Sequence, residues 1–417
     1  MTEPRHAIEA LRAGVPNRAA IRLLGTREDG IRQRFLETLK QCQHSLQCNT
    51  QPTGQVIAGG FGSGKSHLLG YLKELALAEN FIVSWVVISK ETPLFDPGRL
   101  YLSAMRFATV PGCNDDVMTA VLARLKPGSQ AFEELEGWAS DAATDLSPVF
   151  AALLYLFARP ATTPDVIQYM ARFLAGGPLN LTRVKQGLRD AGAAKLFPLK
   201  AVKQADIVQQ RLRFVPRLFT AAGFDGWVVL MDEVELIGRY GILQRGRSYA
   251  ELARWLGIAD TETVPGAVAV AAVTDDFFEE VITKRRDDEQ VPLKLVNKNE
   301  RAAAERARRG IEFLERERKR ATLRPPDQQQ LQTCLDKVRG LYDQAYGWQP
   351  EDIEIGPIAA TTSMRQHIKS WITTWDLERL YRGQRPEIET IALPTNYEEM
   401  KEIEPAREPA GIDFDDE

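Results

Sequence analysis

A glycine-rich loop constrains the fold of this chain more than any other feature of its sequence. The loop fits the pattern of a glycine, four free positions and Gly-Lys-Ser without a mismatch, and it reads Gly59-Gly60-Phe61-Gly62-Ser63-Gly64-Lys65-Ser66. Apolar residues predict a strand at 55–58 before the loop, and an apolar stripe predicts a helix at 67–79 after it. Glycines let successive N–H groups turn toward phosphate oxygens, and the helix N-terminus adds a positive dipole end. The sequence therefore predicts a site for a nucleoside triphosphate.

The loop also predicts individual contacts with ATP and Mg²⁺. We expect residues 59–66, together with His67 at the start of the helix, to surround the nucleotide. Lys65 would reach the β- and γ-phosphates, and the Ser66 hydroxyl would ligate Mg²⁺. The alternative is a glycine-rich turn that matches the pattern by chance.

A second acidic strand end supports the first motif. The apolar run 227–231 is typical of a strand buried on both faces of a parallel sheet, and it ends in Asp232-Glu233. We interpret Asp232 as the Walker B aspartate that holds Mg²⁺, and Glu233 as the general base that polarises the attacking water. A purely structural strand end with two acids is the alternative. Because Glu233 suits activation of water, the pair favours an ATPase over a small-molecule kinase.

Two further apolar runs complete the predicted sheet. Residues 81–89 give a strand after the first helix, and residues 267–273 give another that ends in Thr274-Asp275. With helical segments between them, these strands predict an α/β fold of the P-loop NTPase type, an open parallel sheet with helices on both faces.

Composition and charge exclude several other classes of protein. The hydrophobic content of 44% and the charged content of 26% are those of an ordinary soluble protein, and the net charge of −4 gives no global reason to expect nucleic acid. The sequence shows neither a membrane-spanning stretch nor a signal peptide, so we expect a cytoplasmic protein. The four cysteines lack paired CxxC spacing, so we expect neither a disulfide framework nor a structural zinc. The proximity of Cys42, His44 and Cys48 on an expected helix at 31–46 is interpreted as chance.

The chain is predicted to be one ATPase core interrupted by an insertion. Residues 1–98 would hold the N-terminal segment and the first part of the core, and residues 217–300 the second part with the Walker B and sensor strands. Between them, 99–216 reads as helices separated by breakers such as Pro127-Gly128 and Gly176-Gly177-Pro178. A helical lid is expected at 301–403 and a disordered acidic tail at 404–417.

The chain resembles a known family at three places. The chain is similar to the BrxD-type ATP-binding proteins of BREX anti-phage defence systems in the segment Ala7 to Arg18, in the glycine loop and in Met231-Asp232-Glu233-Val234-Glu235. This family resembles a branch of the AAA+ ATPases that is similar to the origin-recognition initiators. The resemblance implies an ATPase in a DNA-associated defence complex, with partners such as a helicase. It also implies that the N-terminal segment lies near the adenine. The alternative is a helix that merely packs on the core.

The resemblance implies further site residues. In similar ATPases the strand between the loop strand and the Walker B strand ends in a polar residue that positions the lytic water, and Thr274 fits that sensor role. A cap on the following helix is the alternative for Thr274. Arg365 near the start of an expected helix at 363–380 resembles the lid arginine that contacts the γ-phosphate, with a solvated helix arginine as the alternative. A homo-oligomer would supply an arginine finger, for which the candidates are Arg239, Arg245, Arg247, Arg285 and Arg286.

DNA is the partner that the resemblance implies. The basic segment 298–324 could follow a phosphate backbone. Its interleaved glutamates favour instead a solvated helix with Glu–Arg pairs. The competing function is a nucleotide-gated switch or assembly module, in which ATP binding alone holds a conformation.

Overall fold

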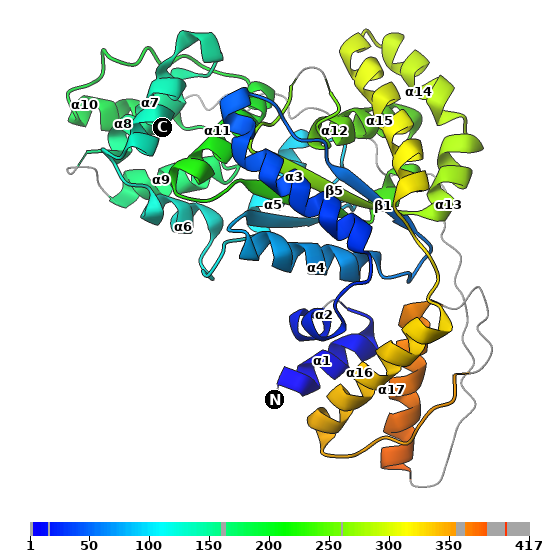
Figure 1. The fold of residues 1–417 in the computed structure, drawn as a ribbon. Helices are drawn as coiled ribbons and strands as arrows, with labels where there is room; N and C mark the ends of the chain where they lie inside the picture. Colours follow the sequence, from blue (N-terminus) through cyan, green and yellow to red (C-terminus); the bar gives the residue numbers. More distant parts are fainter. Residues whose placement is uncertain are drawn as a thin grey trace.

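In a computed structural model of the protein, a six-stranded sheet forms the centre (Figure 1). The structure describes residues 3–15, 17–159, 164–259, 262–355, 363–381 and 397. The strand order is β3-β2-β4-β5-β1-β6, and β3 alone among these strands runs antiparallel to its neighbour. The strands are β1 (Gln55–Gly59), β2 (Ile82–Val87), β3 (Ala108–Thr109), β4 (Trp227–Asp232), β5 (Ala267–Thr274) and β6 (Thr322–Leu323). The predicted mixed α/β fold with a mostly parallel sheet is confirmed, and it is compatible with a P-loop NTPase.

Alternation along the strands explains why helices cover both faces of the sheet. On β4, Val228 and Leu230 pack against α3 (Asp29–Cys48) and α4 (Lys65–Ala78). Val229 and Met231 belong to the other core, which includes residues of α5 (Pro97–Arg106), α12 (Ile242–Trp255) and α15 (Arg301–Arg320). Because successive side chains of a strand point to opposite faces, an unbroken apolar run is buried on both.

The stretch between β3 and β4 is helical. Its elements are α6 (Val117–Arg124), α7 (Gln130–Ser140), η1 (Ala142–Thr144), α8 (Pro148–Phe157), α9 (Pro164–Leu174), α10 (Leu181–Asp190) and α11 (Gln204–Ala221). The boundary predicted at residue 216 falls inside α11, which continues through Pro216. Buried neighbours on both sides, among them Val215 and Leu218, pack in the core, and this packing outweighs the hydrogen bond that a proline removes. The short strand β3 was not expected from the sequence.

The remaining elements of this part of the chain follow β4 and β5. They are η2 (Val234–Arg239), α13 (Asp275–Phe277), η3 (Phe278–Thr283) and α14 (Asp287–Val296). Arg245 on α12 forms a buried ion pair with Asp287, the first residue of α14, at 2.8 Å. The pair therefore joins α12 to α14.

A separate helix bundle lies beside α4 (Figure 1). It contains α1 (Glu3–Ala13), α2 (Arg18–Leu24), α16 (Gln328–Tyr346) and α17 (Met364–Leu380). The bundle has its own hydrophobic core, with Ile8 of α1 and Ala20 of α2 packed among apolar residues of α16 and α17. Ser363 starts α17 with a capping box, as the sequence predicts for a helix beginning there. We refer to these helices as the lid bundle.

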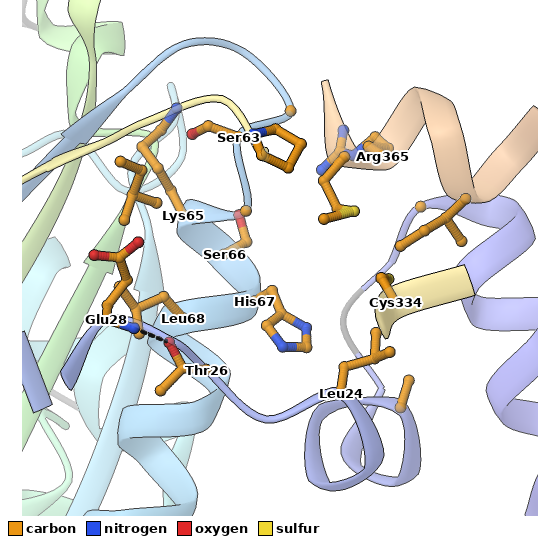
Figure 2. Close-up of a pocket in the computed structure, with 18 of the residues that line it drawn as sticks. Leu24, Thr26, Glu28, Ser63, Lys65, Ser66, His67, Leu68, Cys334 and Arg365 are labelled. Atoms are coloured by element: carbon orange, nitrogen blue, oxygen red, sulfur yellow. Dashed lines mark hydrogen bonds between the residues drawn. The ribbon is translucent and has the colours of Figure 1, made fainter. Parts of the chain in front are cut away.

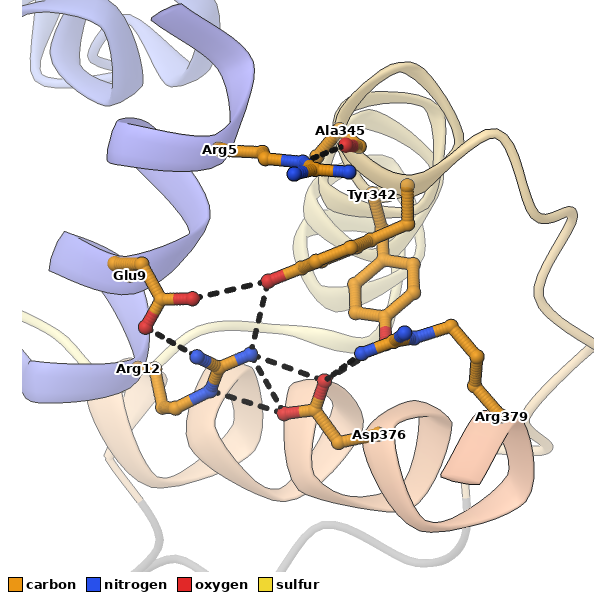
Figure 3. A network of polar contacts seen from close by, with 8 residues as sticks. Arg5, Glu9, Arg12, Tyr342, Ala345, Asp376 and Arg379 are labelled. Carbon is orange, nitrogen blue, oxygen red and sulfur yellow. Dashed lines mark hydrogen bonds and ion pairs between the residues drawn. The ribbon is translucent and has the colours of Figure 1, made fainter. Parts of the chain in front are cut away.

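Polar contacts fasten α1 to the two C-terminal helices of the lid bundle (Figure 3). Asp376 of α17 accepts from Arg12 Nε at 2.9 Å and from the Tyr342 hydroxyl at 2.7 Å. Arg5 donates to the carbonyl of Ala345 at 2.7 Å. The first helix therefore packs on the core of the lid bundle. The predicted acidic tail at 404–417 lies outside the described residues.

Candidate functional site

The glycine loop connects β1 to α4 and depends on backbone conformations that favour glycine. Gly62 and Gly64 have φ values of 75° and 104° in the left-handed region. A Cβ on Gly59 would lie 2.6 Å from Ser63 Oγ, so a side chain does not fit there without a shift. No side chain caps the start of α4 at Gly64, which leaves the first N–H groups of this helix for a ligand.

Lys65 lies at the bottom of this loop and is buried. Its Nζ donates to the carbonyls of Gly59 and Gly60 at 2.8 and 3.0 Å. Burial lowers the pKa of Lys65, and the carboxylates of Glu235 and Asp232 partly offset that shift. The ammonium group is therefore surrounded by acceptors and acids from two separate parts of the chain.

The register of the parallel strands brings the other predicted residues to the same edge of the sheet. Gly59 of β1 pairs with Thr274 of β5, and Asp232 of β4 pairs with Val87 of β2. Asp232 is buried, and its Oδ1 accepts from the N–H of Glu233 at 3.0 Å. The carboxyl ends of parallel strands face one edge, so residues distant in sequence converge there.

Glu233 leaves the strand in an unusual conformation. Its φ of 57° lies in the left-handed region, which costs a non-glycine residue on the order of 1 kcal/mol. The residue is exposed, whereas Asp232 and Val234 beside it are buried. Partial burial, followed by the charge of Asp232, raises the pKa of Glu233. The turn therefore presents a solvent-accessible carboxylate with an increased affinity for protons.

The hydroxyl of Thr274 is not used as a helix cap. Thr274 precedes α13 at the capping position, but its side chain makes no capping hydrogen bond. Its Oγ1 lies instead 2.9 Å from the hydroxyl of Tyr397. The alternative that Thr274 caps the following helix is therefore wrong for the side chain, because Tyr397 offers a partner that the sequence does not reveal.

A cavity of about 370 Å³ joins these elements to the lid bundle (Figure 2). Of the residues predicted to form the site, Gly59 and Gly60 are not among those that line the cavity. The remaining ones all line it, namely Phe61, Gly62, Ser63, Gly64, Lys65, Ser66, His67, Asp232, Glu233, Thr274 and Arg365. The glycine loop, the acidic strand end and the lid thus share one cavity.

Arg365 approaches the loop from the lid bundle, opposite α4 (Figure 2). Its guanidinium lies 5.5 Å from the ring centroid of Phe61, which is 70% exposed. A Cβ on Gly62 would lie 2.6 Å from Ser363 Oγ, so the start of α17 packs directly on the loop. The lid and the loop are therefore in contact at the start of α17.

The opposite side of the cavity is more apolar and includes the N-terminal segment. Leu11 and Leu24 line it together with Cys334 and Ile368 of the lid helices. His67 Nε2 lies 2.8 Å from the carbonyl of Gly25, so this nitrogen carries the proton, and burial lowers the pKa of the ring. Such a wall suits a flat, largely apolar group such as a nucleobase.

Some residues that line or border the cavity were not predicted. Glu235 is 8% exposed, its Oε2 has no hydrogen-bond partner among the described residues, and burial raises its pKa to about 7. The sequence signals for Glu235 were its place two residues after Glu233 and its inclusion in the segment 231–235 that carries the family resemblance. Arg324 lines the cavity from the segment before α16, and Tyr397 borders it through Thr274. Neither carries a motif from which its position could be inferred.

The arginines that follow β4 and β5, among them the candidates for an arginine finger, differ in their contacts. Arg245 is 3% exposed and paired with Asp287. Arg247 pairs with Glu300 at 2.6 Å, and Arg285 donates to the Gly238 carbonyl at 2.8 Å. The buried pair makes Arg245 a structural residue in this chain.

Several arginines of α15 form ion pairs with glutamates, as predicted by the interpretation of the basic segment as a solvated helix with Glu–Arg pairs. Glu305 accepts from Arg308 at 2.7 Å and from Arg309 at 3.0 Å. Arg306 lies 3.2 Å from Glu262. Much of the positive charge of this helix is therefore balanced by neighbouring carboxylates.

Cys42 and Cys48 are free thiols on α3, and no cluster of three or more His, Cys, Asp or Glu side chains among the described residues is arranged to hold a metal ion. None of the described helices has both the length and the apolar character needed to cross a bilayer.

Comparison with known proteins identifies the family. The model of a family described as BREX system ATP-binding protein BrxC/D matches residues 2–125 and 193–370. The stretch between the two matched parts carries α7 to α10. Searches of curated proteins and of solved structures gave no significant match. The match includes the glycine loop, Asp232-Glu233, Thr274 and Arg365, and the chain therefore belongs to the BrxC/BrxD family of BREX system ATP-binding proteins.

Proposed function

We propose that this protein is an AAA+-type ATPase that binds ATP with Mg²⁺ and hydrolyses it in the service of BREX anti-phage defence. The observation that carries the proposal is the single cavity lined by Lys65, Asp232, Glu233, Thr274 and Arg365. These residues come from the glycine loop, two strand ends and the lid, and a phosphate chain with a lytic water needs all three kinds of group.

The lining fits the nucleotide and its metal. A volume of about 370 Å³ lies within the usual range for small-molecule sites. The Ser66 hydroxyl and the buried Asp232 carboxylate are oxygen donors, which Mg²⁺ prefers. Two such ligands suffice, because Mg²⁺ at these sites keeps waters and takes further oxygens from the phosphates. When bound, the metal would neutralise charge on the phosphate oxygens.

Four side chains that line the cavity would each have a separate role in hydrolysis. Lys65 would leave the Gly59 and Gly60 carbonyls to contact the phosphates, and Arg365 would contact the γ-phosphate from the lid. Glu233 would accept a proton from the attacking water, for which its raised pKa is favourable. Thr274 would orient that water from the neighbouring strand.

Separable variants test the assignment. Lys65→Ala should abolish binding of a fluorescent ATP analogue, with Lys73→Ala on the same helix as the matched control. Glu233→Gln should bind the analogue normally and hydrolyse ATP about 100-fold more slowly or worse, as expected for loss of a general base. Glu79→Gln at the exposed end of α4 is its control. Hydrolysis by Glu233→Gln at the parent rate would refute the role of Glu233.

The lid bundle supports a second candidate function, a nucleotide-gated switch. The bundle has its own core, and it meets the ATPase core near the nucleotide cavity, through Arg365 on Phe61 and through Arg18 and Arg22 on Glu74. Nucleotide binding could therefore set the position of the bundle without turnover. A non-hydrolysable analogue that supports partner binding and defence would favour the switch, whereas a need for continued hydrolysis would exclude it.

Partners and assembly belong to the proposal as well. We propose other proteins of the same defence system as partners, a helicase among them, with DNA and a homo-oligomer as further candidates. The ATPase rate with and without single- and double-stranded DNA at several salt concentrations tests the DNA contact. Mass in solution with and without ATP tests the oligomer.

A further inference from the structure

Tyr397 is packed against the end of β5, although it is distant from β5 in the sequence. Its side chain is buried, and its ring packs near Phe277, with the ring centroids 6.4 Å apart. A Cβ on Gly238 would lie 3.0 Å from the tyrosine ring, so only a glycine leaves room for it there. Arg285 donates to the backbone carbonyl of Tyr397 and also to that of Gly238. The residue is thus held by its ring and by its backbone.

The hydroxyl of Tyr397 links two residues of the sensor strand and the following turn. It lies 3.0 Å from Asp276 Oδ1 and 2.9 Å from Thr274 Oγ1. An aspartate carboxylate at neutral pH only accepts hydrogen bonds, so Tyr397 must donate its single proton to Asp276. The remaining bond then requires Thr274 to donate and Tyr397 to accept. The direction of both hydrogen bonds is therefore fixed by chemistry.

This direction decides what Thr274 can offer to the cavity. A threonine hydroxyl has one proton and two lone pairs, and the proton is committed to Tyr397. Toward the cavity, Thr274 Oγ1 can only accept a hydrogen bond. A water molecule has protons to donate, whereas the oxygens of a phosphate do not. The committed hydroxyl thus selects water over a phosphate oxygen as its partner.

We propose that Tyr397 is a positioning residue for the lytic water, acting through Thr274. This inference rests on the proposed hydrolysis. In the step concerned, the water oxygen forms a bond to the γ-phosphorus, the bond from phosphorus to the ADP oxygen breaks, and one water proton passes to Glu233. The other water O–H group points at Thr274 Oγ1, which Tyr397 keeps as an acceptor. Tyr397 itself touches neither water nor nucleotide.

The test is Tyr397→Phe in the full-length protein, because phenylalanine keeps the ring and removes only the hydroxyl. The expected result is a kcat about tenfold lower, which is the effect of losing one hydrogen bond, with an unchanged KM and unchanged affinity for a non-hydrolysable ATP analogue. Tyr381→Phe is the matched control, because Tyr381 is 59% exposed and outside the cavity lining. This control should match the parent in all three quantities.

A double variant separates positioning from simple support of the fold. Thr274→Val removes the acceptor oxygen, so adding Tyr397→Phe should lower kcat no further, as expected for residues that act as a unit. Effects that multiply in the double variant would mean that Tyr397 does not act through Thr274, and would overturn the inference.

The failure of this inference can be distinguished from that of the proposed function. Full activity of Tyr397→Phe, together with loss of hydrolysis in Glu233→Gln, would overturn the role of Tyr397 alone. Absence of hydrolysis in the parent protein would overturn the proposed function, and the role of Tyr397 with it.

Discussion

The buried pair between Arg245 and Asp287 gives a prediction that separates a structural arginine from an arginine finger. Arg245 donates from Nε and Nη2 to the two oxygens of Asp287 at 2.9 and 2.8 Å, and from Nη1 to the Tyr240 carbonyl at 2.7 Å. The hydroxyl of Tyr249 donates to the same carboxylate at 2.9 Å. We predict that Asp287→Leu strongly destabilises the protein, because it removes a buried carboxylate that accepts from two N–H groups of the buried guanidinium.

The magnitude follows from the burial of both partners. The side chains of Arg245 and Asp287 are 4% and 0% exposed, so solvent screens their charges very little. Breaking such a pair by removing one partner costs about 3–5 kcal/mol, whereas replacing both with apolar residues is close to neutral. Asp287→Leu should therefore lower the free energy of unfolding by that amount. Adding Arg245→Met should restore most of it.

Equilibrium unfolding in urea, followed by circular dichroism without nucleotide, measures these differences. The steady-state ATPase rate of each variant that remains folded is recorded in parallel. Arg245→Met alone should also be destabilised, because it leaves Asp287 buried. The reasoning would be refuted if Arg245→Met kept the parent's stability and lost hydrolysis, since that result is the one an arginine finger gives.

Three further predictions concern the cavity and the lid. Without nucleotide and Mg²⁺, the pKa of Glu235 is about 7 in the folded protein and near its ordinary value of 4.5 in the unfolded chain. The free energy of unfolding of the parent should therefore fall as the pH rises from 4.5 to 7. Glu235→Gln should abolish this fall in urea titrations. Arg12→Leu should cost about 1 kcal/mol, since Arg12 and Asp376 are 32% and 17% exposed, and should speed amide exchange in α1 about fivefold. Gly62→Ala should weaken ATP binding about tenfold by calorimetry, because a Cβ there meets Ser363 and φ is 75°.

Features with a local physical cause could be predicted from the sequence. The glycine loop follows from its spacing, and β4 and β5 follow from unbroken apolar runs that only a doubly covered sheet buries. The start of α17 at Ser363 follows from its capping residues. Arg365 could be proposed for the cavity because its place near the start of that helix resembles that of the lid arginine in similar ATPases.

Features that depend on distant contacts could not be predicted. Pro216 reads as a helix boundary, yet core packing on both sides carries α11 through it. Glu235 reads as one more acid after the Walker B pair, and its burial is decided by the chain that covers it. No local sequence pattern indicates the position of Tyr397, because the residues that contact it are Gly238, Phe277 and Arg285, which are distant in the sequence. Such positions are set by tertiary structure alone.

The packing of α1 in the lid bundle has a consequence for how the chain folds during synthesis. Ile8 is fully buried among residues of α16 and α17, which the ribosome makes hundreds of residues later. Until those helices emerge, the apolar face of α1 has no native partner and remains available for wrong associations. The core of the lid bundle therefore cannot be completed before α17 has been made, and a chaperone that shields residues 3–13 would act during that interval.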